Sequence, residues 1–161
     1  MYYLINIIIS NEKTNEDTIF DFKYIFLGNT INNRILENGK FTRIYYSTPL
    51  CSFNGIYLLL ELDDILESNL NNTNNNKILI NIEKNKVLIE QIKKIEQTIL
   101  DVINIKNKTQ TCNIYTDFLK GYLRLNYRYN ITKIILKISG IWETNNTYGL
   151  SFKYSYIKQY K

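Results

Sequence analysis

Aromatic and basic residues alternate along three stretches of the chain, and they have the chemistry to bind single-stranded nucleic acid. The stretches are YLRLNYRYN (122–130), KIILKISGIWE (133–143) and YGLSFKYSYIK (148–158). Bases of a single strand stack on exposed rings, and its phosphates attract Lys and Arg. The candidate nucleic-acid-binding residues come from these stretches, their flanks and residues 41–46; they are Phe41, Arg43, Tyr45, Tyr46, Lys120, Tyr122, Arg124, Tyr127, Arg128, Lys137, Trp142, Lys153, Tyr154 and Tyr156.

Strand alternation decides which of these side chains share a face. Within residues 148–156, one face would carry Tyr148, Leu150, Phe152, Tyr154 and Tyr156, and the other Ser151, Lys153 and Ser155. The rings either stand in solvent beside the cations or line the interior, because Tyr and Phe are also good core residues of strands. With fourteen Tyr in the chain, we expect some of them at the surface.

The sequence offers no comparable pattern for catalysis. It has no His, so a Ser or Cys nucleophile lacks its usual base and a zinc site lacks a common ligand. Cys51 and Cys112 make no disulfide framework, and no glycine-rich phosphate loop is present. The acidic residues Glu61, Asp63, Asp64 and Glu67 supply oxygen ligands for Mg²⁺, although a helix N-terminus or a solvated loop is the simpler interpretation. We therefore expect no enzyme, no cofactor and no metal.

Charge divides the chain into an acidic and a basic part. Residues 1–70 carry five Lys/Arg and nine Asp/Glu, a net charge of −4; residues 71–161 carry fifteen and six, a net charge of +9, which together give the chain's +5. A basic part indicates a polyanionic partner, and an acidic part favours a basic protein or a second copy of the chain. The abundance of Ile, Asn, Lys and Tyr is typical of AT-rich coding DNA and favours a virus, plasmid or parasite as the source. The lack of an export signal and of a long apolar run predicts an intracellular protein.

Apolar patterns predict a β-rich domain with one long helix. Strands are expected at 2–9, 18–27, 40–47, 56–62 and 78–82, followed by three near the C-terminus. Alternation would place Phe20, Phe22, Tyr24 and Phe26 on one face of the second strand, and Phe41, Arg43 and Tyr45 on one face of the third.

A stripe of apolar residues predicts an amphipathic helix at about 86–105; it comprises Val87 or Leu88, Ile92, Ile95, Ile99, and Val102 or Ile103. Residues 116–120 predict one helical turn, and the Asn-rich residues 69–77 a flexible loop. The expected fold is a single β-rich α+β domain over residues 1–161, an OB-like barrel or sandwich of about seven to eight strands flanked or plugged by the helix. A two-layer α+β sandwich is the alternative.

Two stretches, GKFTRIYYSTPLCSFNGIYLLLEL (39–62) and LKISGIWETNNTYGLSFKYSYI (136–157), resemble small single-stranded-DNA-binding proteins of large DNA viruses and related mobile elements, especially AT-rich viruses of insects. The resemblance implies an OB-like barrel that coats single strands during replication as a dimer or larger assembly. It assigns strand contacts to Arg43, Tyr45, Tyr46, Trp142, Lys153 and Tyr154. Phage-type proteins of this class end in an acidic tail that recruits replication enzymes, whereas this chain ends KQYK. The acidic stretch 61–67 would have to take that role.

The function expected from the sequence is non-catalytic binding of single-stranded DNA. RNA is not distinguished, because no residue pattern marks contact with a 2′-hydroxyl. The alternative is a virion or matrix protein that uses the aromatic strands as a subunit interface, with the acidic part of one copy facing the basic part of the next.

Overall fold

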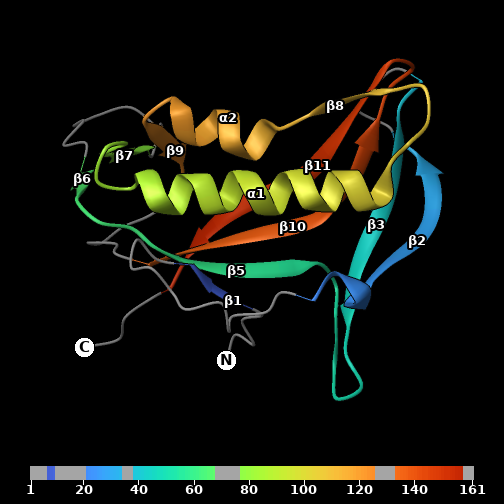
Figure 1. Cartoon of the computed structure of the whole chain (residues 1–161), viewed down its shortest axis with the longest axis horizontal. Coiled ribbons are helices and arrows are strands. Elements are labelled where there is room, and N and C mark those ends of the chain that lie inside the picture. Colours follow the sequence, from blue (N-terminus) through green and yellow to red (C-terminus); the bar gives the residue numbers. More distant parts are fainter. Residues whose placement is uncertain (1–6, 10–20, 34–37, 68–76, 126–132, 158–161) are drawn as a thin grey trace.

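The structure is a computed structural model that describes residues 7–9, 21–33, 38–67, 77–125 and 133–157. In these residues the chain forms a large and a small β-sheet with two helices (Figure 1). The large sheet contains β1 (Ile7–Ile9), β2 (Ile25–Asn32), β3 (Lys40–Ser47), β4 (Ser52–Phe53), β5 (Ile56–Glu61), β8 (Thr109–Thr111), β10 (Lys133–Glu143) and β11 (Thr147–Tyr156). The small sheet contains β6 (Ile65–Glu67), β7 (Lys77–Ile80) and β9 (Tyr122–Arg124), and the helices are α1 (Lys86–Ile103) and α2 (Asn113–Leu119). The predicted β-rich α+β class is confirmed.

Strand β10 organises the large sheet because it pairs with three other strands. Its first half pairs with β5 and its second half with β3, while β11 runs antiparallel beside both halves. A bulge between Ile138 and Gly140 lies where the partner changes, as expected of bulges that bend a strand. The strand order is β1-β5-β10-β11-β8, with β3 joining β10 to β2 and β4. The described strands form an open sheet and not a closed barrel, so the barrel form of the expected 'OB-like barrel or sandwich' is not what they build.

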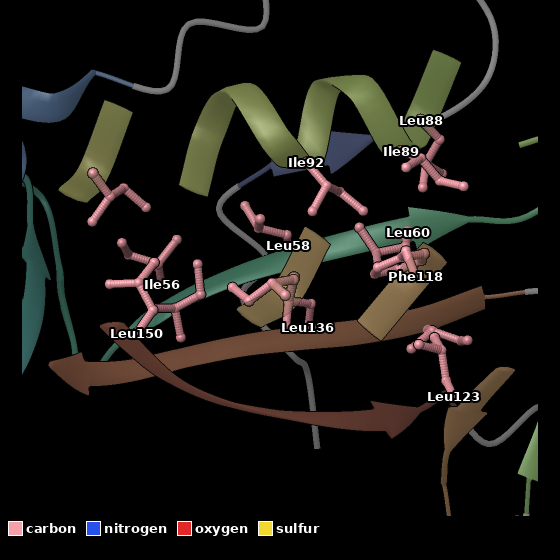
Figure 2. Close-up of a cluster of buried hydrophobic side chains, with 14 of the residues drawn as sticks. Ile56, Leu58, Leu60, Leu88, Ile89, Ile92, Phe118, Leu123, Leu136 and Leu150 are labelled. Atoms are coloured by element: carbon pink, nitrogen blue, oxygen red, sulfur yellow. The ribbon is translucent and has the colours of Figure 1, made fainter. Parts of the chain in front are cut away.

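Helix α1 covers one face of the large sheet (Figure 1). The predicted stripe is confirmed in outline: Leu88, Ile92 and Ile99 are buried, whereas Val87 and Val102 are 41% and 57% exposed. The helix ends two residues before its expected end, because Asn104 adopts a left-handed conformation with φ of 38°. Figure 2 shows the core between α1 and the sheet, and the labelled side chains are Ile56, Leu58, Leu60, Leu88, Ile89, Ile92, Phe118, Leu123, Leu136 and Leu150. No helix in the described ranges is long and apolar enough to span a membrane.

The segment before β2 differs from the prediction. Phe22–Tyr24 form a 3₁₀ turn, and strand β2 begins only at Ile25. The carboxylate of Asp21 accepts a hydrogen bond from the backbone N–H of Lys23, and such local bonds compete with strand pairing. The expected alternation of Phe22, Tyr24 and Phe26 is therefore wrong. Strand β2 then continues to Asn32, beyond the expected end of the strand at residue 27.

The C-terminal third also departs from three consecutive strands. Strand β9 pairs with β7 in the small sheet, whereas β10 and β11 form a hairpin in the large one. The single turn expected at 116–120 is the longer helix α2, which starts at Asn113 and packs against α1, β9 and β11. The Asn-rich stretch 69–76 lies outside the described residues, and Lys77 belongs to β7.

Candidate nucleic-acid interface

Strand β3 carries three of the predicted residues on the face of the large sheet that is turned away from α1, here called the outer face. Phe41, Arg43 and Tyr45 alternate with core residues such as Ile44, which confirms that they share a face. Tyr45 is 37% exposed next to the exposed Arg43. Tyr46, another candidate contact, is only 7% exposed. Alternation places it on the core side of the strand.

Three cations lie on neighbouring strands of the outer face. Lys137 on β10 and Lys153 on β11 are directly opposite each other in the antiparallel register. The guanidinium of Arg43 donates a hydrogen bond to the side-chain oxygen of Asn54 (3.2 Å). The side chain of Lys137 lies over Gly55, the residue that follows Asn54. A Cβ added at Gly55 would lie 3.1 Å from Cε of Lys137. We call Arg43, Lys137 and Lys153 the basic strip.

The surroundings of the basic strip favour an anion. No described carboxylate lies within ion-pair distance of these three cations, whereas the neighbouring Lys133 pairs with Glu61 at 2.6 Å. Like charges directly opposite each other on adjacent strands destabilise a sheet. A phosphate bound between Lys137 and Lys153 would remove that repulsion.

Aromatic rings accompany the strip. The ammonium group of Lys137 lies 4.9 Å from the ring centroid of Tyr57, a residue that the sequence analysis did not select. The sequence places Tyr57 on a predicted strand. Its contact with Lys137 follows from the pairing of β5 with β10, which the sequence does not give. Phe41 and Trp142 cover glycines: a Cβ added at Gly140 would lie 2.5 Å from Phe41 Cζ, and one added at Gly149 would lie 2.7 Å from Trp142 Cζ2. Both rings are half-buried on the sheet.

Four other predicted residues, together with Lys153, meet at a pocket beside β11. Strand β8 pairs only with Thr147–Gly149, and no other described strand continues along that edge of β11. A pocket of about 420 Å³ opens there between α2, β9 and β11. Its lining comprises Lys120, Tyr122, Arg124, Lys153 and Tyr154, together with Asp117 and Phe152, which were not among the predicted site residues. The outer face and this pocket share Lys153.

Tyr154 is less available than its place in the pocket lining suggests. Its ring packs edge-on against Phe118 of α2, with centroids 6.0 Å apart. Its hydroxyl is buried without a hydrogen-bond partner among the described residues, and burial raises the pKa of this phenol well above its ordinary value. Tyr156 is half-buried on the same core-facing side of β11. Tyr127 and Arg128, also predicted site residues, lie outside the described residues.

No protein-family model matches this chain, and no curated protein sequence or solved structure is significantly similar to it.

A buried carboxylate positions α2, which forms one wall of the pocket. Glu96 of α1 is 0% exposed, and its two oxygens accept hydrogen bonds from the backbone N–H groups of Ile114 (3.0 Å) and Tyr115 (2.8 Å). The N-cap residue of α2, Cys112, makes no side-chain capping bond, so Glu96 supplies the cap from a different helix. Burial raises the pKa of Glu96, and the backbone N–H donors oppose part of that effect.

The acidic stretch is largely engaged within the chain. Glu61 pairs with Lys133, and Asp64 pairs with Lys84 at 3.0 Å. The hydrogen bond from Lys84 lowers the pKa of Asp64, and one from Asn81 adds to the effect. In the described part of the chain, no three His, Cys, Asp or Glu side chains are grouped to hold a metal ion. A protein that binds the acidic stretch would have to compete with Lys133 and Lys84.

Proposed function

We propose that this protein binds single-stranded nucleic acid, without catalysis, through the basic strip and the rings beside it. The observation that carries the proposal is the placement of Lys137 opposite Lys153, with Arg43 close by and no described carboxylate paired to any of them. Two lysines directly opposite each other repel, and a nucleic-acid backbone is an anionic ligand that would offset this repulsion.

The strip and the rings would have separate tasks. Arg43, Lys137 and Lys153 contact phosphates and give affinity with little sequence preference. Tyr45, exposed beside Arg43, offers a face on which a base can stack. OB domains also bind strands across one face of a sheet, so the proposal keeps the expected OB-like mode of binding without a closed barrel. Coating of single-stranded DNA during replication of a virus or virus-like element is the setting that this chemistry fits.

A salt titration tests the proposal. We expect fluorescently labelled oligothymidylate to bind with about micromolar affinity at low ionic strength and to weaken steeply as salt is added, because bound phosphates displace counterions. Fluorescence anisotropy at several salt concentrations measures both quantities, and oligodeoxyadenylate serves as the sequence control. Absence of binding at low salt, or affinity independent of salt, would contradict the proposal.

A second candidate function, self-assembly, is favoured by strand β2. This strand pairs with β3 on one side, and no described strand pairs with its other side. It carries no charged residue, and Phe26, Leu27 and Ile31 are 53%, 50% and 58% exposed. An uncharged edge with exposed apolar side chains can pair antiparallel with the same edge of a second copy about a two-fold axis. The edge of β2 would then serve as the subunit interface.

Substitution of the edge residues tests self-assembly. Phe26→Lys with Ile31→Lys should raise the dissociation constant of a dimer about tenfold or more, since both side chains would lose apolar burial and the two edges would repel. Sedimentation velocity over a protein dilution series measures the change. Leu50→Lys, at a residue 95% exposed in a turn, is the matched control. A wild-type protein that stays monomeric at all concentrations would rule out this candidate.

A further inference from the structure

The pocket beside β11 differs from the basic strip in shape and in charge. The strip lies on the outer face of the sheet, whereas the pocket is a hollow of about 420 Å³ walled by α2, β9 and β11. This volume falls within the range of small-molecule sites, roughly 300–1,000 Å³, and suits one nucleotide better than a length of strand. The pocket therefore has the dimensions of a site for a single nucleotide.

Three cations converge on this hollow. Lys120 follows the end of α2, Arg124 ends β9, and Lys153 lies on β11. The one acid in the lining, Asp117, already pairs with Lys120 at 2.6 Å. The lining thus has three positive charges against one negative charge, a net charge of +2.

The net charge of the pocket lining favours one of two kinds of phosphate. An internal phosphodiester of a strand carries one negative charge, whereas a phosphate monoester carries about −1.5 to −2 at neutral pH. The monoester matches the pocket more closely. Arg124 also has the planar group that binds two phosphate oxygens at once, and the lysines add point charges.

Aromatic side chains supply the rest of a nucleotide site. The ring of Tyr122 forms part of the lining, and the ammonium group of Lys77 lies 4.7 Å from its centroid. Phe152 lies beside Tyr154, with ring centroids 5.5 Å apart. A base or sugar attached to the phosphate would therefore meet apolar ring surface next to the cations.

We infer that this pocket binds a phosphate monoester carried on a nucleoside, which is either the phosphorylated end of a nucleic-acid strand or a free nucleotide. The inference rests on the proposed function for its class of ligand, nucleic acid. A strand seated by its terminal phosphate would run out of the pocket past Lys153 onto the basic strip. The protein would then distinguish the ends of a strand from its interior.

Competition binding tests the inference with the full chain. Short oligothymidylates with a 5′-phosphate, a 3′-phosphate or neither are compared, together with thymidine and thymidine monophosphate as free ligands. We expect one phosphorylated end to bind about tenfold more tightly than the unphosphorylated strand, because it adds charge-assisted hydrogen bonds. The preference should fall as the pH drops below about 6, where the monoester gains a proton.

Variants assign the preference to the pocket. Arg124→Gln should abolish the ratio between phosphorylated and unphosphorylated strands, whereas Lys106→Gln, at an exposed residue after α1, should leave that ratio unchanged. Equal binding of all strands by the wild type, or a preference that survives Arg124→Gln, would overturn the inference and leave the proposed function standing. Binding of thymidine monophosphate without binding of any oligonucleotide would support the pocket and overturn the proposed function. If neither oligonucleotides nor thymidine monophosphate bind, both the inference about the pocket and the proposed function are overturned.

Discussion

Lys137→Glu combined with Lys153→Glu is expected to reduce affinity for single-stranded DNA about 100-fold at low salt, because two phosphate contacts are replaced by repulsion. The slope of log affinity against log salt should also become shallower by about 1.4, since each contact to a single strand contributes about 0.7. Anisotropy titrations of oligothymidylate at several salt concentrations measure both changes.

The control for this variant carries the same change in net charge on the other side of the molecule. Lys86→Glu with Lys94→Glu places the substitutions on exposed residues of α1, which packs on the opposite face of the sheet. Long-range attraction of DNA is reduced equally in both proteins, so the excess loss reports contact at the strip. Equal losses would show that the strip is not the binding surface.

A single substitution separates binding from stability at the same site. Lys153→Glu puts a carboxylate directly opposite Lys137, and an opposite-charge pair there should add about 0.2–1 kcal/mol to the free energy of unfolding. The same substitution should weaken DNA binding. A protein that becomes more stable while binding less well is the expected result if the two lysines are retained for a ligand.

Glu96→Ala is expected to lower the free energy of unfolding by about 2–3 kcal/mol, because one buried and one partly buried N–H group at the start of α2 lose their acceptor. Urea unfolding followed by circular dichroism measures this loss. The variant should also impair any binding at the pocket, since α2 carries Asp117 and leads into Lys120. A loss below about 0.5 kcal/mol, the usual range for surface substitutions, would show that the cap is dispensable.

The same carboxyl group predicts a pH dependence. Its pKa in the folded protein is raised above the ordinary value of 4.5, mainly by burial, so the folded state holds the proton more tightly than the unfolded state. The stability that this proton contributes is fully present below pH 4.5 and is lost as the pH rises through the higher folded pKa. Glu96→Gln should flatten the decline in this window while costing less than Glu96→Ala. An unchanged slope in the Gln variant would assign the decline to other groups.

The sequence predicts which aromatic side chains share a face of a strand, but it does not predict which face of the sheet is covered. Alternation within β3 placed Phe41, Arg43 and Tyr45 on one face correctly, because the side-chain period of a strand is a local property. Alternation does not tell which of the two faces is covered, so it left open whether Tyr46, a candidate contact, is exposed; the structure buries it on the core side. The face that α1 covers is set by packing between segments far apart in the chain.

The sequence by itself determined the β-rich α+β class, the long helix α1 and the concentration of positive charge after residue 70. These features depend on the hydrophobic period, the helix amphipathicity and the composition of short segments, which are local properties of the chain. Only the tertiary structure decided that β9 leaves the large sheet, that Lys137 stands opposite Lys153, and that Lys120, Arg124 and Lys153 surround one pocket. Those relations depend on strand order and register. They are fixed by long-range pairing and core packing, which no short stretch of residues specifies.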